Sequence, residues 1–109
     1  MIKRKIEELD IIPLNHDSGC KKVLFNYQDF DTPCRQISIA NFKKGDVCEA
    51  HTHPTLDEHF VWQKGSGYFL LDGQQVDFTA GDYIYVPATT EHSIFFSEDS
   101  ECLCIGVAL

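Results

Sequence analysis

The sequence lacks any hydrophobic run near the ~18 residues that a membrane span requires, although 43% of its 109 residues are apolar. It also lacks the apolar core of a secretion signal, because the basic start, Met1 to Lys5, is followed at once by Glu7, Glu8 and Asp10. We therefore expect a cytoplasmic protein that makes no membrane contact.

Basic residues are scarce, with nine lysines and arginines against seventeen aspartates and glutamates and a formal net charge of −8. Binding to nucleic acids and to anionic membrane surfaces depends on cationic contacts with phosphate. The charge balance argues against both kinds of partner.

The five cysteines are odd in number and irregular in spacing, so they do not indicate a disulfide framework. We interpret them as reduced thiols that act as small apolar groups. Cys102 and Cys104 share a strand face and could form a soft ligand pair, but a terminal core strand explains them equally well. Cys48 should point away from a site at His51 if the strand between them is regular.

Long helical patterns, internal repeats and linkers are absent as well, and short extended runs rich in β-branched and aromatic residues take their place. From residue 35 onward these runs cover residues 35–42, 49–53, 58–63, 68–71, 74–78, 83–86, 93–96 and 102–108. Turn residues separate them, and Asp72-Gly73 is the strongest hairpin signal. The pattern predicts one all-β domain, an antiparallel sandwich or barrel.

The first 34 residues are less regular. Residues 22–27 read as a short strand. The segment from Ile6 to Ile12 fits either a short helical turn or a strand, and Pro13 would end a helix there.

A group of metal-binding side chains lies between residues 51 and 58. If residues 49–53 are extended, His51 and His53 leave the same face of the strand. Pro54 and Asp57 favour a bend, after which a second strand can bring Glu58 beside both imidazoles. Two histidines and a carboxylate form the donor set of a non-haem Fe(II) or similar divalent centre with open coordination positions.

The glycines, histidines and one proline follow two spacing patterns. The first pattern consists of Gly45, His51, His53, Glu58 and Gly65, and the second of Gly81, Pro87 and His92. Together they resemble the two motifs of the cupin superfamily. The chain departs from the second motif at two positions, where Thr89 replaces a glycine and Phe96 replaces an asparagine.

The resemblance implies a double-stranded β-helix, a jelly roll of two sheets, in a small single-domain protein of residues 1–109. The motifs and their strands span residues 35–108, and residues 1–34 would supply N-terminal strands or an arm. The implied metal ligands are His51, His53, Glu58 and His92, around one divalent ion (Fe, Mn, Ni or Zn) with two open positions. A homodimer paired through edge strands is also implied.

Several side chains are candidates to line a substrate pocket: Gln36, Phe60, Trp62, Tyr83 and Tyr85. Phe60 and Trp62 lie two and four residues after Glu58 and so on the same strand face, although both are equally compatible with an ordinary core. His59 should face the opposite side of that strand, as a structural or exposed residue, and His16 is expected to be exposed.

A jelly roll supports many chemistries, so the sequence leaves several functions open. The first hypothesis is a metal-dependent enzyme acting on a small oxygenated molecule, with Glu58 or a nearby tyrosine moving protons. It would be a dioxygenase with iron, or an isomerase, epimerase or lyase with manganese, nickel or zinc. The alternative is a binding module that senses or carries a small, sugar-like ligand without turnover. A metal-free sugar-nucleotide isomerase is the third hypothesis, and the intact donor set disfavours it.

Overall fold

The computed structural model of the protein describes residues 1–14 and 18–109, so the prediction for His16 falls outside the described residues. One short helical turn and ten strands follow one another in the described residues. They are η1 (Ile6–Glu8), β1 (Ile12–Pro13), β2 (Cys20–Asn26), β3 (Cys34–Phe42), β4 (Val47–His51), β5 (Leu56–Lys64), β6 (Ser66–Leu71), β7 (Gln74–Thr79), β8 (Tyr83–Val86), β9 (His92–Phe96) and β10 (Ser100–Ala108).

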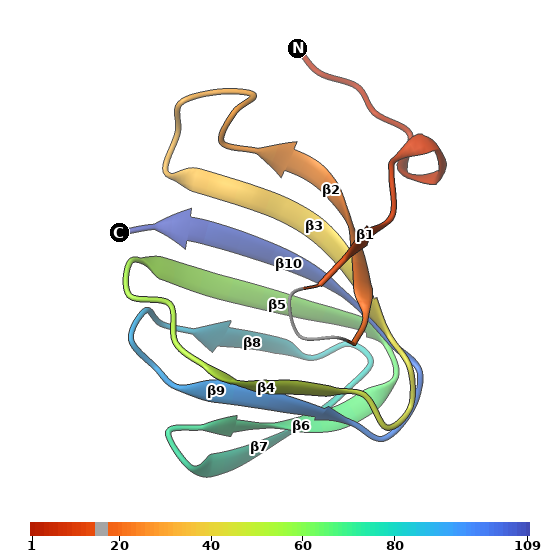
Figure 1. The fold of residues 1–109 in the computed structure, drawn as a ribbon, viewed down its shortest axis with the longest axis vertical. Helices are drawn as coiled ribbons and strands as arrows, with labels where there is room; N and C mark the ends of the chain where they lie inside the picture. Colours follow the sequence, from red (N-terminus) through yellow and green to blue (C-terminus); the bar gives the residue numbers. More distant parts are fainter. Residues whose placement is uncertain (15–17) are drawn as a thin grey trace.

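The strands form two antiparallel sheets that face each other (Figure 1). The larger sheet has the strand order β1-β2-β3-β10-β5-β8, and the smaller sheet has the order β4-β9-β6-β7. This arrangement confirms the predicted all-β fold, with a 3-10 turn at Ile6–Glu8 as its only helical element among the described residues. None of the described helical segments has the length and apolar character to cross a bilayer.

The predicted strands from residue 35 onward correspond to β3 through β10, with differences of a few residues at their ends. Asp72 and Gly73 form the predicted hairpin turn between β6 and β7, where Leu71 pairs with Gln74. Both turn residues have positive φ, 47° at Asp72 and 82° at Gly73, which is the backbone twist that a two-residue hairpin loop favours.

One strand departs from regular alternation in a way that changes the site. In the pairing of β4 with β9, Cys48 lies opposite Ile94 and His51 lies opposite His92, so β4 holds one extra residue in between. This bulge places Cys48 and His51 on the same inner face. The expectation that Cys48 points away from the site is therefore wrong, because it assumed a regular strand.

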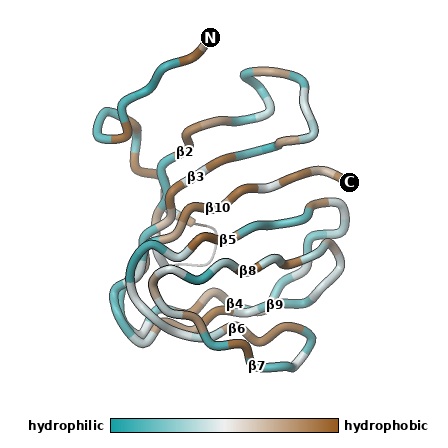
Figure 2. Tube along the Cα trace, turned by 180° about the vertical axis from the view of Figure 1, so that it is seen from behind, coloured by the Kyte–Doolittle hydropathy of each residue, from teal (hydrophilic) through white to brown (hydrophobic). Residues whose placement is uncertain are grey.

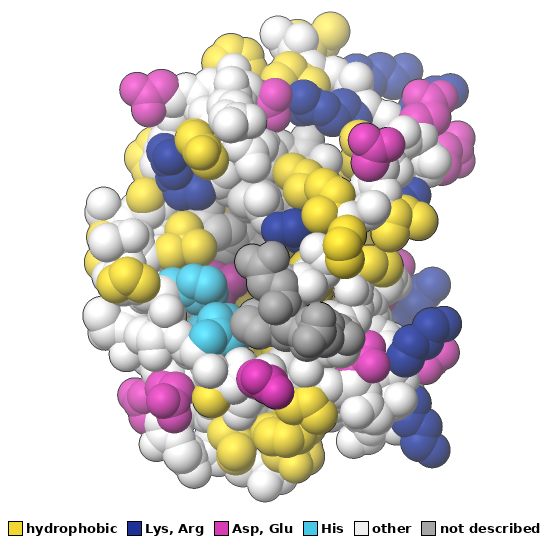
Figure 3. Space-filling view, in the orientation of Figure 1, with side chains coloured by type: hydrophobic (Ala, Val, Ile, Leu, Met, Phe, Trp, Pro, Cys, Tyr) yellow, Lys and Arg dark blue, Asp and Glu magenta, His cyan; other side chains and the backbone are white. Residues whose placement is uncertain are grey.

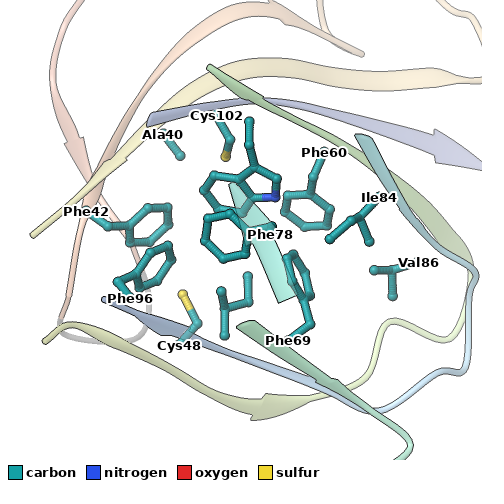
Figure 4. Close-up of a cluster of buried hydrophobic side chains, with 12 residues drawn as sticks. Ala40, Phe42, Cys48, Phe60, Phe69, Phe78, Ile84, Val86, Phe96 and Cys102 are labelled. Carbon is teal, nitrogen blue, oxygen red and sulfur yellow. The ribbon is translucent and has the colours of Figure 1, made fainter. Parts of the chain in front are cut away.

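The core lies between the sheets and is dominated by aromatic rings (Figure 4). Trp62 is fully buried at its centre and stacks on Phe78, with ring centroids 3.9 Å apart. Phe96, at the position where the second motif has an asparagine, is also buried and stacks on Phe42 with centroids 4.1 Å apart. That departure from the motif therefore adds an aromatic ring to the core instead of a polar group.

Candidate metal centre

Four side chains from three strands and one loop converge at one end of the space between the sheets. His51 ends β4, His53 follows it in the loop, Glu58 lies on β5, and His92 begins β9. One ligand atom from each of these residues lies within 4.8 Å of those from the other three. The structure thus brings together all four residues that the motifs single out.

The loop that carries His53 is held by the backbone of the second motif. Strand β4 ends at His51, so His53 does not continue that strand as the sequence suggested. Instead the Thr89 N–H donates a hydrogen bond of 2.8 Å to the His53 carbonyl oxygen. Thr89 has a φ of 70°, the left-handed conformation for which the motif uses glycine. The loop therefore keeps this geometry at a cost of about 1–2 kcal/mol for a residue with a Cβ.

Hydrogen bonds to the backbone orient two of the imidazole rings. Nδ1 of His51 lies 2.8 Å from the Glu49 carbonyl oxygen, and Nδ1 of His92 lies 3.0 Å from that of Thr90. A carbonyl oxygen can only accept, so each Nδ1 carries the proton and each neutral ring has its lone pair on Nε2. Metal-binding imidazoles are commonly fixed in this way by their second nitrogen.

Glu58 Oε1 occupies the centre of the cluster. It lies 3.1 Å from Nε2 of His53 and 3.3 Å from Nε2 of His92. Among the described residues, Glu58 Oε1 and His92 Nε2 are two of the three buried side-chain polar atoms without a hydrogen-bond partner. When His92 is neutral with its proton on Nδ1, both atoms carry lone pairs, and facing lone pairs in a buried site are stabilised by a shared cation. The donor set and these two atoms therefore fit a divalent metal ion.

The charges of the cluster are strongly coupled. Burial alone would raise the pKa of Glu58, but attraction to the His53 and His92 imidazoles, when these rings are protonated, outweighs burial and holds that pKa well below its usual range. Contact with Glu58 raises the pKa of His53, against the opposing effect of burial. Glu58 is thus a carboxylate at neutral pH, the form that binds a metal ion.

The cluster opens into a cavity of about 260 Å³. Its lining combines the four cluster residues with further side chains of β1, β2, β3, β4, β5, β9 and β10. Histidine side chains reach the molecular surface next to acidic and hydrophobic side chains on the face shown in Figure 3. A small molecule can therefore reach the cluster from outside.

The candidate pocket residues separate into two groups. Gln36 and Phe60 line the cavity. Trp62 is placed deeper, in the aromatic core, since each step of two residues along β5 moves away from Glu58. Tyr83 and Tyr85 lie on the outer face of β8, because Ile84 and Val86 occupy its inner face. The structure thus does not bring Trp62 or the two tyrosines to the cavity.

His59 faces away from the cluster, as its parity indicated. Its ring stacks on Tyr83 and Tyr85, and its Nδ1 lies 2.6 Å from the Tyr83 hydroxyl.

Sequence reasoning did not place Cys48, Ser38 or Lys21 at the cavity, and it left open whether Cys104 binds a ligand or belongs to the core. Sγ of Cys104 lies 3.6 Å from Oε2 of Glu58, and Cys48 also faces the cavity. Burial raises the pKa of Cys48 to about 12 and that of Cys104 well above its usual value, so both are neutral thiols at neutral pH. Lys21 had no detectable signal in the sequence, because the register of β2 with β3 decides which way its side chain points.

Comparison with known proteins identifies the family. A family model described as a cupin domain matches residues 38–107 of the 109-residue chain. The chain belongs to the cupin family. This confirms the resemblance that the two motifs carry, and the matched segment of this cupin contains all four residues of the cluster.

Two curated proteins share sequence with this cupin. The DNA damage-repair/toleration protein DRT102 of Arabidopsis thaliana is 32% identical over 100 residues, which cover 90% of this chain and 28% of that protein. Quercetin 2,3-dioxygenase of Bacillus subtilis (strain 168) is 38% identical over 50 residues, which cover 46% of this chain and 15% of the enzyme. The cupin therefore spans less than a third of each relative's length.

A crystal structure described as a predicted oxalate decarboxylase from Thermotoga maritima has the same fold. It superimposes with a TM-score of 0.88 at 21% identity, covering 99% of this cupin and all of that chain. The likeness extends over the N-terminal strands β1 and β2 as well as the motif region. At this identity it shows the shared fold alone.

Proposed function

We propose that this cupin is a metal-dependent enzyme acting on a small oxygenated molecule that binds within the cavity. The observation that carries the proposal is the pair of buried acceptor atoms, Glu58 Oε1 and His92 Nε2, that face each other without a hydrogen-bond partner. A divalent ion held by His51, His53, Glu58 and His92 would satisfy both atoms.

The bound metal would act as a Lewis acid or a redox centre, according to which ion it is. The protein's own contribution is to hold the substrate and to exclude water. Phe60 and Ile94 supply apolar cavity walls, and Ser38 and Gln36 supply polar groups that can orient oxygen atoms. These residues favour a molecule with a few oxygen functions on a small carbon frame.

We further propose that Glu58 moves protons during turnover. Its two oxygen atoms have different surroundings, because Oε1 faces the imidazoles while Oε2 lies 3.6 Å from the Cys104 thiol. Oε1 can thus remain with the imidazole cluster while Oε2 exchanges a proton with a substrate in the cavity.

The similar proteins favour catalysis over simple binding. One relative is a dioxygenase, and the structure from Thermotoga maritima is described as a predicted decarboxylase. The alternative, a non-catalytic binding module, would use the same cluster only to hold its ligand. Dioxygenase, isomerase and lyase chemistry differ in whether oxygen is consumed.

The test is metal analysis of protein purified without added metal or chelator, followed by oxygen uptake and product analysis with small diols, keto acids and hydroxy acids. We expect about one divalent ion per chain and turnover of at least one class. Iron with substrate-dependent oxygen uptake would identify a dioxygenase, and turnover without uptake an isomerase or lyase. Metal without turnover would favour the binding module, and protein that takes up no metal would contradict the proposal.

We also propose a homodimer that uses the outer face of the larger sheet next to β8. Tyr83 and Tyr85 are 58% and 44% exposed on this edge strand. Leu103 and Ile105 of β10 face the same outer side, since they alternate with Cys102 and Cys104, which line the cavity. Hydrophobic segments recur along β3 and β10 in the middle of this sheet (Figure 2).

Light scattering on a sizing column is expected to give the mass of two chains for the wild type. Replacing both Tyr83 and Tyr85 by lysine should convert it to a monomer, because charges at the centre of an interface are costly to desolvate. Phe30→Lys, at a position that is 53% exposed in the loop between β2 and β3, is the control and should leave the dimer intact. A monomeric wild type, or a dimeric tyrosine variant, would contradict this interface.

A further inference from the structure

The cavity wall opposite the motif strands contains a lysine. Lys21 lies on β2, outside the segment that the cupin family model matches, and pairs with Ala40 of β3. Both residues line the cavity, because paired residues of neighbouring strands point to the same face of a sheet. Among the described residues that line the cavity, Lys21 is the only lysine or arginine.

The ammonium group of Lys21 is partly buried and has a neutral partner. Its Nζ donates a hydrogen bond of 3.0 Å to Oε1 of Gln36, which also lines the cavity. Within the described residues, basic and acidic side chains approach each other only at Arg4 with Asp29 and at His53 and His92 with Glu58, so Lys21 has no carboxylate partner there. A partly buried cation without an anion is stabilised by any anion that enters the cavity.

The charges that line the cavity also favour an anionic ligand. Glu58 is the only acidic residue among its described lining, and the metal proposed above would use that carboxylate as a ligand. A divalent ion together with Lys21 would leave the cavity with two uncompensated positive charges. This local excess lies in a protein whose formal net charge is −8.

We propose that Lys21 is a specificity-determining residue that binds an anionic group of the substrate. The substrate class is then a small acid with two functional ends, one that chelates the metal with oxygen atoms and a carboxylate or similar anion that pairs with Lys21. The amide of Gln36 holds the ammonium group in place until the anion binds. The inference rests on the proposed metal centre for the chelating end of the substrate, and on Lys21 alone for the anionic end.

The neighbouring lysine provides a matched control. Lys22 follows on the same strand but pairs with Ile39, on the outer face, and its Nζ donates a hydrogen bond of 3.0 Å to the carbonyl oxygen of Ile6. Removing the charge at residue 22 changes the net charge of the protein as much as removing it at residue 21. Only the change at residue 21 alters the cavity.

The test uses cobalt-loaded protein, whose visible absorption reports ligands entering the metal's coordination sphere. The probes are α-ketoglutarate and α-ketoadipate, each compared with the keto acid of equal chain length that lacks the distal carboxylate, α-ketovalerate or α-ketocaproate. We expect tighter binding of at least one diacid than of its partner. Lys21→Met should lower the affinity for that diacid at least about 10-fold and should leave the affinity for the monoacid within about twofold of the wild-type value.

Lys21→Arg should retain the preference for the diacid, and Lys22→Met should bind all four probes as the wild type does. Equal weakening of diacid and monoacid in Lys21→Met would assign Lys21 a structural role and overturn the inference, as would an unchanged preference. Cobalt stoichiometry is measured for every protein to separate the two proposals. If the wild type binds no cobalt, the metal proposal fails. Calorimetry of the metal-free protein with the same probes then decides whether Lys21 selects the diacid.

Discussion

Replacing His92 by alanine is expected to lower the affinity for divalent metal by more than about 100-fold, beyond the 10- to 100-fold typical of losing an outer-shell partner. His92 is 2% exposed, and its Nε2 has no hydrogen-bond partner among the described residues. Its loss would remove a donor that is held in place by the bond between its Nδ1 and the Thr90 carbonyl oxygen. Competition with a chromophoric chelator would measure the affinity.

The domain should remain folded in this variant, because the aromatic core around Trp62 does not depend on the ion. His59→Ala is the matched control, since His59 lies on β5 next to Glu58 but faces the outer side. It should bind metal as the wild type does. Metal affinity near the wild-type value in His92→Ala would refute the site. Global unfolding on metal loss would instead make the metal structural.

Replacing Trp62 by alanine is expected to lower the free energy of unfolding by about 3–5 kcal/mol, the usual range for deleting a large buried aromatic side chain. Trp62 is 0% exposed and contacts the rings of Phe42, Phe60, Phe69, Phe78 and Phe96. The loss is a large share of the roughly 5–15 kcal/mol that stabilises a domain. Urea unfolding followed by far-ultraviolet circular dichroism would measure this loss of stability. Tryptophan fluorescence cannot be used, because Trp62 is the only tryptophan in the sequence.

Trp62→Phe should cost less, about 1–2 kcal/mol, because it keeps an aromatic ring and removes the buried Nε1–H, which has no hydrogen-bond partner among the described residues. Phe30→Ala removes an aromatic ring that is 53% exposed and should change stability by no more than about 0.5 kcal/mol. If Trp62→Ala cost about as little as Phe30→Ala, the core would not be organised around the indole.

These two variants separate the role of the histidine cluster from that of the aromatic core. The aromatic core fills one part of the space between the sheets, and the histidine cluster with its cavity fills another. Six residues of the core cluster also line the cavity: Ala40, Phe42, Cys48, Phe60, Ile94 and Cys102. A change at His92 should therefore act on metal binding, and a change at Trp62 on stability.

The sequence by itself determined the fold class, the approximate strands and the cluster. The alternation of β-branched and aromatic residues between turn residues is a local property, so it predicts β6 to β8 and the Asp72-Gly73 hairpin without tertiary information. The spacing of His51, His53, Glu58 and His92 is equally local to two short motifs.

Only the tertiary structure decided which side chains join that cluster. The bulge in β4 turns Cys48 inward, the register of β2 with β3 turns Lys21 inward, and the direction of β8 turns Tyr83 and Tyr85 outward. Each depends on which residues of distant strands pair, and a shift of one residue reverses the face of every side chain. The composition of the strand itself does not record that pairing. The motifs therefore identify the four residues that could hold a metal ion, whereas the register of distant strands selects the other side chains that line the cavity.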